Sequence, residues 1–167
     1  MSQDRLGYGS DGTVWKTSVP SAVKALYRQK NYQVELECYR RLQKANIKKI
    51  NSLNIPVLEG YDDNLWVIEM TFVQPPFFLD FGKVRLDRPP SDFYDAQKLA
   101  NAKQEWRALF GSRWKEVNLI LFQLSNRFGI HYLDPRPGNI NFGDDDDDDD
   151  DDDAWQSEPG IDYSEYD

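Results

Sequence analysis

The stretch "GIHYLDPRPGNINF", residues 129–142, decides how the rest of the chain is interpreted. Asp134 is followed two positions later by Arg136 and five positions later by Asn139. Ten consecutive aspartates, residues 144–153, come almost directly after the stretch. A carboxylate, a cation and an amide within six residues suggest a chemical site. The sequence on either side decides which kind of site it is and whether the acidic run belongs to it.

The net charge of the chain comes from that acidic run. The charge is −9 over 167 residues, and the ten aspartates alone carry −10, so the remainder is close to +1. Such a remainder has no concentrated basic face, which argues against a nucleic-acid binder. The hydrophobic fraction of 40% supports one ordinary core, divided at most into two small lobes.

Nothing in the sequence points to export or to a membrane. The single cysteine, Cys38, excludes an internal disulfide, and the start "MSQDRLGYGS" lacks the basic and apolar regions of a secretory signal. No apolar run approaches the length that crosses a bilayer. We therefore expect a cytoplasmic protein with no membrane contact.

Residues 5–73 predict strands around one helix. The segments "TVWKTS", "SAVKAL" and "LWVIEM" are rich in the β-branched and aromatic residues of strands. Residues 32–45 predict the helix, because Tyr32, Glu35, Tyr39 and Leu42 fall on one stripe at helical spacing.

The second half predicts an extended connector and then a helix. Pro-Pro pairs at 75–76 and 89–90 bracket the connector, since proline disfavours helix in the residue before it. An apolar face predicts a helix over roughly 114–128, and Gly129 is a typical helix stop. The predicted fold class is α+β, with a small antiparallel sheet and one helix in residues 1–73 and a mainly helical part in residues 74–167.

Glycines near the start of the chain give the first chemical signal. Gly7, Gly9, Gly12 and Val14 form the pattern G-x-G-x-x-G-x-V. The pattern opens a set of strands, whereas a dinucleotide-binding turn follows a strand and leads into a helix. Glycines here let the backbone approach phosphates, with Val14 covering a flat base. A plain glycine-rich hairpin is an equally weighted alternative.

Lys24 and Glu35 form the second signal. A carboxylate on the buried stripe of a helix requires a cation, and Lys24 on the preceding strand is the natural partner. The alternatives are a solvated surface lysine and a boundary position on an amphipathic helix.

In this order, the motifs resemble those of the protein-kinase-like family of serine/threonine type. "LGYGSDGTVW" resembles its glycine-rich loop, "SAVKAL" the segment of its ATP-phosphate lysine, "ELECYRRL" the helix whose glutamate pairs with that lysine, and "LWVIEMTF" the hinge. The opening stretch resembles the catalytic loop of the family, although Tyr132 stands where the family has histidine. The resemblance covers most of residues 5–142 and implies a short form lacking most of the C-terminal lobe.

The resemblance implies a phosphotransferase that uses ATP and Mg²⁺. Asp134 would orient the acceptor hydroxyl, Arg136 would approach the transferred phosphate, and Asn139 would bind metal. The residues expected to bind ATP are Gly7, Gly9, Gly12, Val14, Ala22, Lys24, Glu35, Glu69, Met70 and Thr71. The alternative is a catalytically inactive module of pseudokinase-like fold that binds nucleotide or another protein. Expected partners are the nucleotide and either a protein substrate or a second copy of the chain.

A second metal-binding aspartate is harder to identify. The family carries it in an Asp-Phe-Gly triplet after the loop, whereas the triplet of this chain, residues 80–82, precedes the loop. We expect this triplet to be a coincidence within the connector. Asp162 in "GIDYSEYD" is the preferred ligand, because Ile161 and Tyr163 can pack around it. Asp152 or Asp153, at the end of the acidic run, is the alternative.

The acidic run is expected to be disordered or loosely extended, as part of the connection between "INF" and "PGIDY". Ten like charges repel one another and stay hydrated. The functional alternatives are a segment that binds cations weakly and an intramolecular competitor near the metal site.

Overall fold

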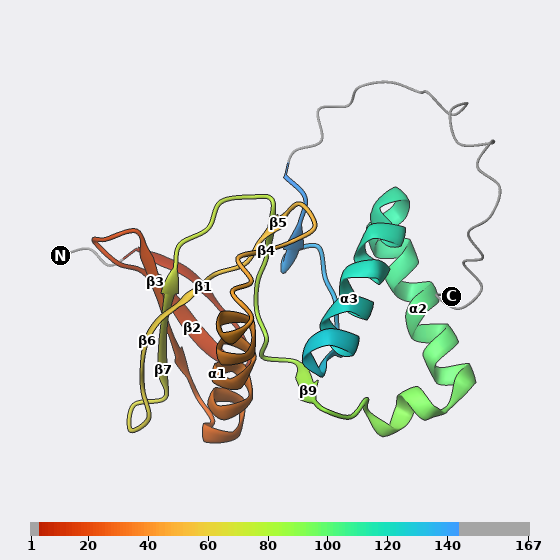
Figure 1. Cartoon of the computed structure of the whole chain (residues 1–167), viewed down its shortest axis with the longest axis horizontal. Helices are drawn as coiled ribbons and strands as arrows, with labels where there is room; N and C mark the ends of the chain where they lie inside the picture. The colour runs from red at the N-terminus through yellow and green to blue at the C-terminus, as the bar shows by residue number, and fades with distance from the viewer. Residues whose placement is uncertain (1–3, 144–167) are drawn as a thin grey trace.

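The computed structural model describes residues 4–143. A sheet with helix α1 forms one part, helices α2 and α3 form the other, and short strands join them (Figure 1). The predicted α+β class, with a small antiparallel sheet and one helix followed by a mainly helical part, is confirmed.

The sheet has five antiparallel strands in the order β1-β2-β3-β7-β6. Their bounds are Arg5–Tyr8, Gly12–Lys16, Ser21–Leu26, Val67–Thr71 and Leu58–Asp62, in that order. Strand β3 alternates, so that Ala22, Lys24 and Leu26 are buried on one face. Gly12 is required where β2 meets β3, because a Cβ there would lie 2.5 Å from the carbonyl oxygen of Ala25.

Helix α1, Gln29–Lys44, lies against this sheet and contacts β3, β6 and β7. The predicted stripe is its buried face, with Tyr32, Tyr39 and Leu42 each 2% exposed. Glu35 shares that face and is fully buried at 0% exposure. The helix therefore brings a carboxylate into the core opposite the buried lysine of β3.

Helix α3, Trp114–Phe128, begins and ends where the sequence predicted. Its apolar face is fully buried at Val117, Ile120 and Leu124. Gly129 ends it in the left-handed conformation with φ of 64°, which satisfies the last carbonyl groups. The helix stop predicted from the sequence is therefore confirmed.

Helix α2, Ala96–Phe110, was not predicted. Asp95 is its N-cap, since the Asp95 side chain accepts hydrogen bonds from the backbone N–H groups of Gln97 and Lys98. Trp106 and Phe110, four residues apart, form its buried contacts. Short 3-10 turns at Ser91–Tyr94 and Gly111–Arg113 flank it.

Two small sheets connect the two parts. Strand β10, Ile130–Tyr132, pairs with β9, Val84–Leu86. The other sheet has the order β11-β8-β5-β4, with bounds Ile140–Asn141, Phe77–Phe78, Leu53–Asn54 and Lys49–Ile50. It takes two strands from each side of residue 73, where the sequence predicted a domain boundary.

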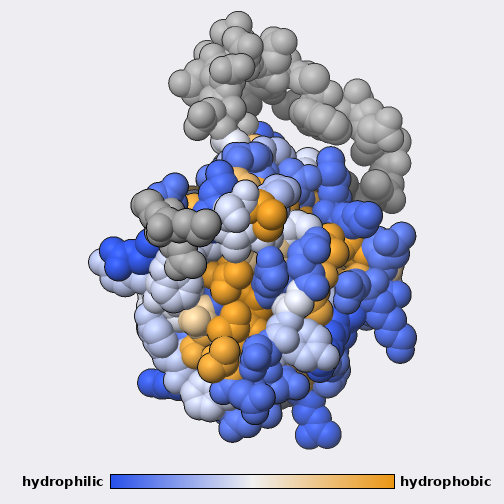
Figure 2. Space-filling view, turned by 90° about the vertical axis from the view of Figure 1, so that its left-hand side faces the viewer, coloured by the Kyte–Doolittle hydropathy of each residue, from blue (hydrophilic) through white to orange (hydrophobic). Residues whose placement is uncertain are grey.

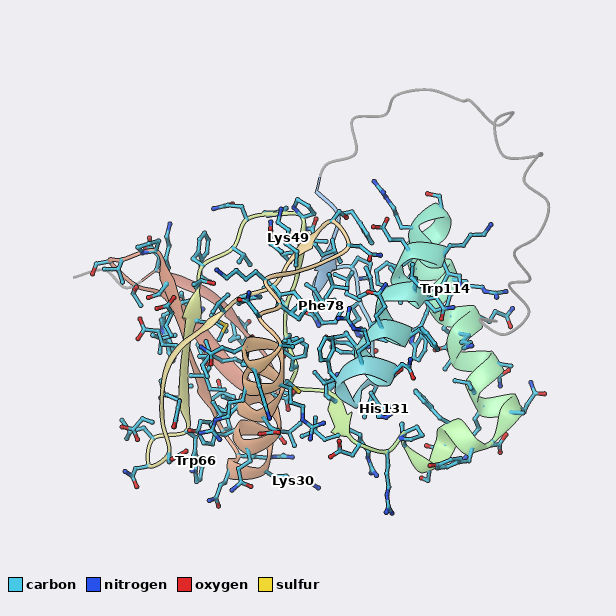
Figure 3. All side chains as sticks on the ribbon, in the orientation of Figure 1. Lys30, Lys49, Trp66, Phe78, Trp114 and His131 are labelled. Carbon is cyan, nitrogen blue, oxygen red and sulfur yellow. The ribbon has the colours of Figure 1, made fainter. Side chains whose placement is uncertain are left out.

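The aromatic connector fills this junction. Phe78 and Phe81 are fully buried, and their rings stack with centroids 5.5 Å apart. Edge contacts at 5.2 Å join Phe81 to Tyr39 of α1 and Phe78 to Tyr132 of β10. Figure 3 shows Phe78 between the sheet part and helix α3. The connector is therefore a core element that fixes the sheet part against the helical part.

Figure 2 views the molecule from the side of the sheet, where apolar side chains gather into a patch with polar side chains around it. Large apolar side chains are exposed in the first half of the chain at Leu6, Val19 and Leu65. Among the residues that the structure describes, no helix is long and apolar enough to cross a membrane. Self-association of the chain stays a prediction.

Candidate functional site

A cleft of about 430 Å³ brings the predicted motifs together. Its walls come from the glycine-rich segment, strand β3, helix α1, the end of β7, residues 79–83 and the loop after β10. Lys24, Glu35, Asp134, Arg136 and Asn139, predicted from distant parts of the sequence, all line it.

The inner end of the cleft is a buried ion cluster, which we call the inner cluster: Lys24, Glu35 and Asp80. The Lys24 Nζ donates to Glu35 Oε1 and Oε2, both at 2.8 Å, and to Asp80 Oδ1 at 2.9 Å. The Lys24 side chain is 8% exposed and the Glu35 side chain 0%, whereas that of Asp80 is 39% exposed. An ammonium group has three donors, so these three bonds use all of them.

Burial and charge oppose each other within the inner cluster. Burial acts to lower the pKa of Lys24, but the carboxylates of Glu35 and Asp80 outweigh it and hold that pKa above its ordinary value. Burial raises the pKa of Glu35 despite the adjacent ammonium. Burial also acts to raise the pKa of Asp80, but Lys24 and the Gly82 N–H group lower it below its ordinary value. The cluster is therefore a strongly coupled set of charges.

The position of Asp80 corrects the sequence argument. The triplet at residues 80–82 was expected to be a coincidence because it precedes the loop, yet its aspartate contacts Lys24 inside the cleft. Strand β8, before the triplet, pairs with β11, after the loop, and Leu79 N donates to Asn139 O at 2.7 Å. The position of the triplet before the loop in the sequence was therefore a poor guide to its position in space, because a non-local strand pair brings the triplet beside the loop.

The outer end of the cleft holds a second cluster, which we call the outer cluster: Lys83, Asp134 and Arg136. The Lys83 Nζ lies 3.0 Å from Asp134 Oδ2, and the Arg136 Nε donates to the same oxygen at 2.9 Å. Burial acts to raise the pKa of Asp134, but Arg136 and Lys83 hold it below its ordinary value. The sequence did not predict Lys83 as a site residue, since its only signal was its position directly after the triplet at residues 80–82.

Tyr132 and Asn139 lie at the two ends of the loop that carries Asp134 and Arg136. The Tyr132 hydroxyl donates to the carbonyl oxygens of Leu79 and Asp80, and burial raises the pKa of Tyr132. Tyr132 therefore supports the chain beside Asp80. Asn139 lines the cleft, with its backbone N–H donating to Arg136 O at 2.9 Å.

The glycine and hinge segments form the remaining walls. Gly7, Gly9, Gly12, Val14 and Ala22 line the cleft, and their binding of ATP stays a prediction. A Cβ at Gly7 or Gly9 would meet nothing within 4 Å, so open space adjoins both residues.

The three predicted hinge residues do not share one position. Met70 and Thr71 line the cleft, whereas Glu69 does not. The Glu69 side chain accepts a hydrogen bond from Ser21 Oγ at 2.7 Å. Phe72 and Val73 line the cleft instead, so its wall continues beyond the predicted segment.

The charges of the cleft bear on metal binding. Three cations and four carboxylates line it, the fourth carboxylate being Asp11 of the glycine segment. Within residues 4–143 no group of three or more His, Cys, Asp or Glu side chains could hold a metal ion by itself. Asp162, Asp152 and Asp153, the metal ligands proposed from sequence, and the acidic run lie outside the described residues.

Comparison with known proteins identifies no family. No family model matches the chain, and no curated protein matches it. One similar solved structure is titled "Structure of the streptomycin-ATP-APH(2")-IIa ternary complex", with 16% sequence identity and a TM-score of 0.40. The match covers 83% of this chain and 37% of that one, so this chain spans well under half of its length.

Proposed function

We propose that the chain is a kinase-like phosphotransferase that binds ATP with Mg²⁺ and transfers the terminal phosphate to a hydroxyl group. One observation carries the proposal: a single cleft joins the buried Lys24–Glu35 pair to Asp80 and to Asp134 with its two cations. Phosphoryl transfer relies on positioning and charge neutralisation, and this cleft supplies groups for both.

Nucleotide binding would use the walls described above. The adenine would lie against Val14, Ala22 and Met70, which line the cleft from neighbouring strands of the sheet, with Thr71 at the end of β7 beside them. The phosphates would pass the open space beside Gly7 and Gly9, toward Lys24. Lys24 would exchange its contact with Asp80 for a phosphate oxygen, because all three of its donors are engaged by carboxylates.

A divalent cation fits the donor set of the inner end. Carboxylates outnumber cations in the cleft, so a triphosphate needs a counter-ion there. Magnesium prefers oxygen ligands, keeps several waters and often takes one or two protein ligands beside the phosphates. Asp80 and Asn139 would supply those ligands, with Asp162 an additional candidate. When bound, the ion neutralises charge on the phosphate oxygens.

Asp134 would act on the acceptor. Its carboxylate accepts the proton of the acceptor hydroxyl as the new oxygen–phosphorus bond forms. The bond between the terminal phosphorus and the bridging oxygen breaks, and ADP leaves with that oxygen. Arg136, beside Asp134, stabilises the charge on the transferred group. The acceptor hydroxyl would belong to a protein, including this chain itself.

Thermal unfolding with ATP tests nucleotide binding. We expect ATP with Mg²⁺ to raise the midpoint, because ligand at 100 times its dissociation constant stabilises the native state by about 2.7 kcal/mol. ATP with EDTA should give little shift, since the cleft is then anionic. Asp80→Asn removes one negative charge and one proposed metal ligand. The rise in midpoint with ATP and EDTA should therefore become larger, and the additional rise with Mg²⁺ should become smaller. If Asp80→Asn showed the same two shifts as the unchanged chain, with Mg²⁺ and with EDTA, the assignment of Asp80 as a metal ligand would be contradicted.

Replacing the loop carboxylate tests turnover. Asp134→Ala should keep ATP binding but lose phosphate transfer by a factor of about 10² to 10⁴, the usual contribution of a general base. The matched control is Asp92→Ala, which removes another carboxylate paired to one lysine, Lys98, outside the cleft. Equal activity of the two variants would remove Asp134 from the reaction.

The second candidate is an inactive module that binds nucleotide or another protein. It is favoured by the contacts of Lys24, whose three donors are all engaged by Glu35 and Asp80. A module that binds nucleotide would show an ATP-dependent thermal shift. It would transfer no phosphate, so Asp134→Ala would not change its activity.

A further inference from the structure

Lys83 has a fixed backbone and an adjustable side chain. Its carbonyl oxygen accepts from Leu133 N at 3.0 Å, next to the first β9–β10 pair, Val84 with Tyr132. This backbone contact holds Lys83 beside the residue that precedes Asp134. The Lys83 side chain is 51% exposed, so its ammonium group has room to move.

The donors of the cleft are unequally occupied. Lys24 uses all three of its N–H groups on Glu35 and Asp80. The ammonium of Lys83, by contrast, makes one hydrogen bond within the described residues, to Asp134. Its other two donors have no acceptor within residues 4–143 and are available to an anion that enters the cleft.

We propose that Lys83 binds the terminal phosphate of the nucleotide and makes the cleft prefer the triphosphate over the diphosphate. The inference rests on the proposed function, because it requires a nucleotide whose phosphates reach the outer cluster. It assigns a role to a residue that the sequence motifs did not identify.

Distances support this assignment. An acceptor oxygen bonded to Asp134 lies about 3 Å from that carboxylate, and the reacting phosphorus lies about 3 to 3.5 Å from the acceptor oxygen. A cation 3.0 Å from Asp134 Oδ2 is therefore within reach of the oxygens of the same phosphate. A diphosphate that binds in the same register does not extend to this point.

Charge supports it as well. Lys83 and Arg136 surround a single carboxylate, so the outer cluster carries one positive charge in excess. A terminal phosphate would compensate that charge without displacing Asp134. Lysine is a common point-charge ligand of phosphate, and its bonds to phosphate are charge-assisted.

Dissociation constants for ATP and ADP, measured by calorimetry with Mg²⁺ on the full chain, test the proposal. Lys83→Met should weaken ATP binding about tenfold or more, the effect of one charge-assisted hydrogen bond, while ADP binding changes less than about twofold. Lys83→Gln should behave in the same way, and Lys83→Arg should keep most of the preference for ATP. The matched control is Lys98→Met, a 60% exposed lysine with one aspartate partner outside the cleft.

The outcomes separate the two proposals. One outcome is that the unchanged chain binds ATP while Lys83→Met and Lys83→Gln weaken the binding of ATP and ADP equally, or leave the binding of both unchanged. In either case the role of Lys83 is overturned and the proposed function stands. If the unchanged chain binds neither nucleotide, the proposed function fails and the role of Lys83 fails with it.

Discussion

The two ends of the cleft are built from the same kinds of side chain in opposite proportions. The inner cluster has two carboxylates around one ammonium, and the outer cluster has two cations around one carboxylate. The first carries one negative charge in excess and the second one positive charge. A charge gradient along the cleft follows, which suits a metal ion at the inner end and a phosphate group at the outer end.

Burial separates the Lys24–Glu35 pair of the inner end from the two cations of the outer end. Lys24 and Glu35 are almost inaccessible, whereas the side chains of Lys83 and Arg136 are 51% and 64% exposed. Buried ions must keep their partners, because a lone buried charge is very costly. Exposed ions can change partners at little cost. The Lys24–Glu35 pair is therefore part of the folded core, and the cations of the outer end are free to respond to a ligand.

The largest expected effect on stability comes from Glu35→Gln. Removing this charge leaves Lys24 buried with Asp80 as its only carboxylate, so we expect a loss of about 3 kcal/mol, the low end for a broken buried pair. Urea unfolding measures it. Glu37→Gln, on the same helix but 41% exposed, is the control and should change stability by less than about 1 kcal/mol. Similar losses in both variants would mean that the inner cluster is not structural.

Gly12→Ala should give the next largest loss. Its Cβ would lie 2.5 Å from the backbone oxygen of Ala25, which cannot move aside as a side chain does. We expect about 2 kcal/mol of destabilisation from this overpacking. Gly9→Ala is the matched control in the open part of the cleft, where a Cβ meets nothing within 4 Å. Its stability should change by less than about 0.5 kcal/mol. A stable Gly12→Ala variant would show that the strands separate easily.

Outer-cluster variants should be nearly neutral for folding. Lys83→Met and Arg136→Gln each remove one exposed ion pair, so each should cost less than about 1 kcal/mol, and less still at high salt. The measurement is urea unfolding at low and at high sodium chloride concentration. A cost as large as that of Glu35→Gln would erase the distinction between the two ends.

The sequence predicted what local periodicity and burial determine. Helices α1 and α3 were found because their apolar stripes recur at helical spacing. Helix α3 has the predicted limits, Trp114–Phe128, whereas α1, Gln29–Lys44, begins three residues before the predicted range of 32–45. The contact between Lys24 and Glu35 was predicted because a carboxylate on a buried stripe requires a cation.

What the sequence did not predict depends on non-local pairing or on a weak pattern. Asp80 joins the site only because β8 pairs with β11 across the intervening helices. Lys83 enters the site with it, through the pairing of β9 with β10. Helix α2 buries few side chains, chiefly Trp106 and Phe110, so its stripe was too sparse to predict a helix.

The smallest expected effect concerns the strand that leads into the outer cluster. His131, the sole histidine, lies on β10 opposite Arg85, and burial lowers its pKa below 6.5 although Asp87 acts to raise it. A depressed pKa means that the unfolded chain takes up the proton first. The contribution of His131 to stability is therefore complete above pH 6.5 and is lost as pH falls through its folded pKa.

Titration of the imidazole by NMR gives that pKa directly, because one histidine produces one set of signals. A midpoint below 6.5 is expected in the folded chain. Asp87→Asn should lower it further, since the carboxylate that favours the charged ring is removed. Asp87 also binds Arg41 of α1, at 2.7 Å, so urea unfolding of the same variant must show that the fold persists. A midpoint at or above 6.5 would mean that β10 is solvated, and that the strand preceding Asp134 is as open to water as the outer cluster.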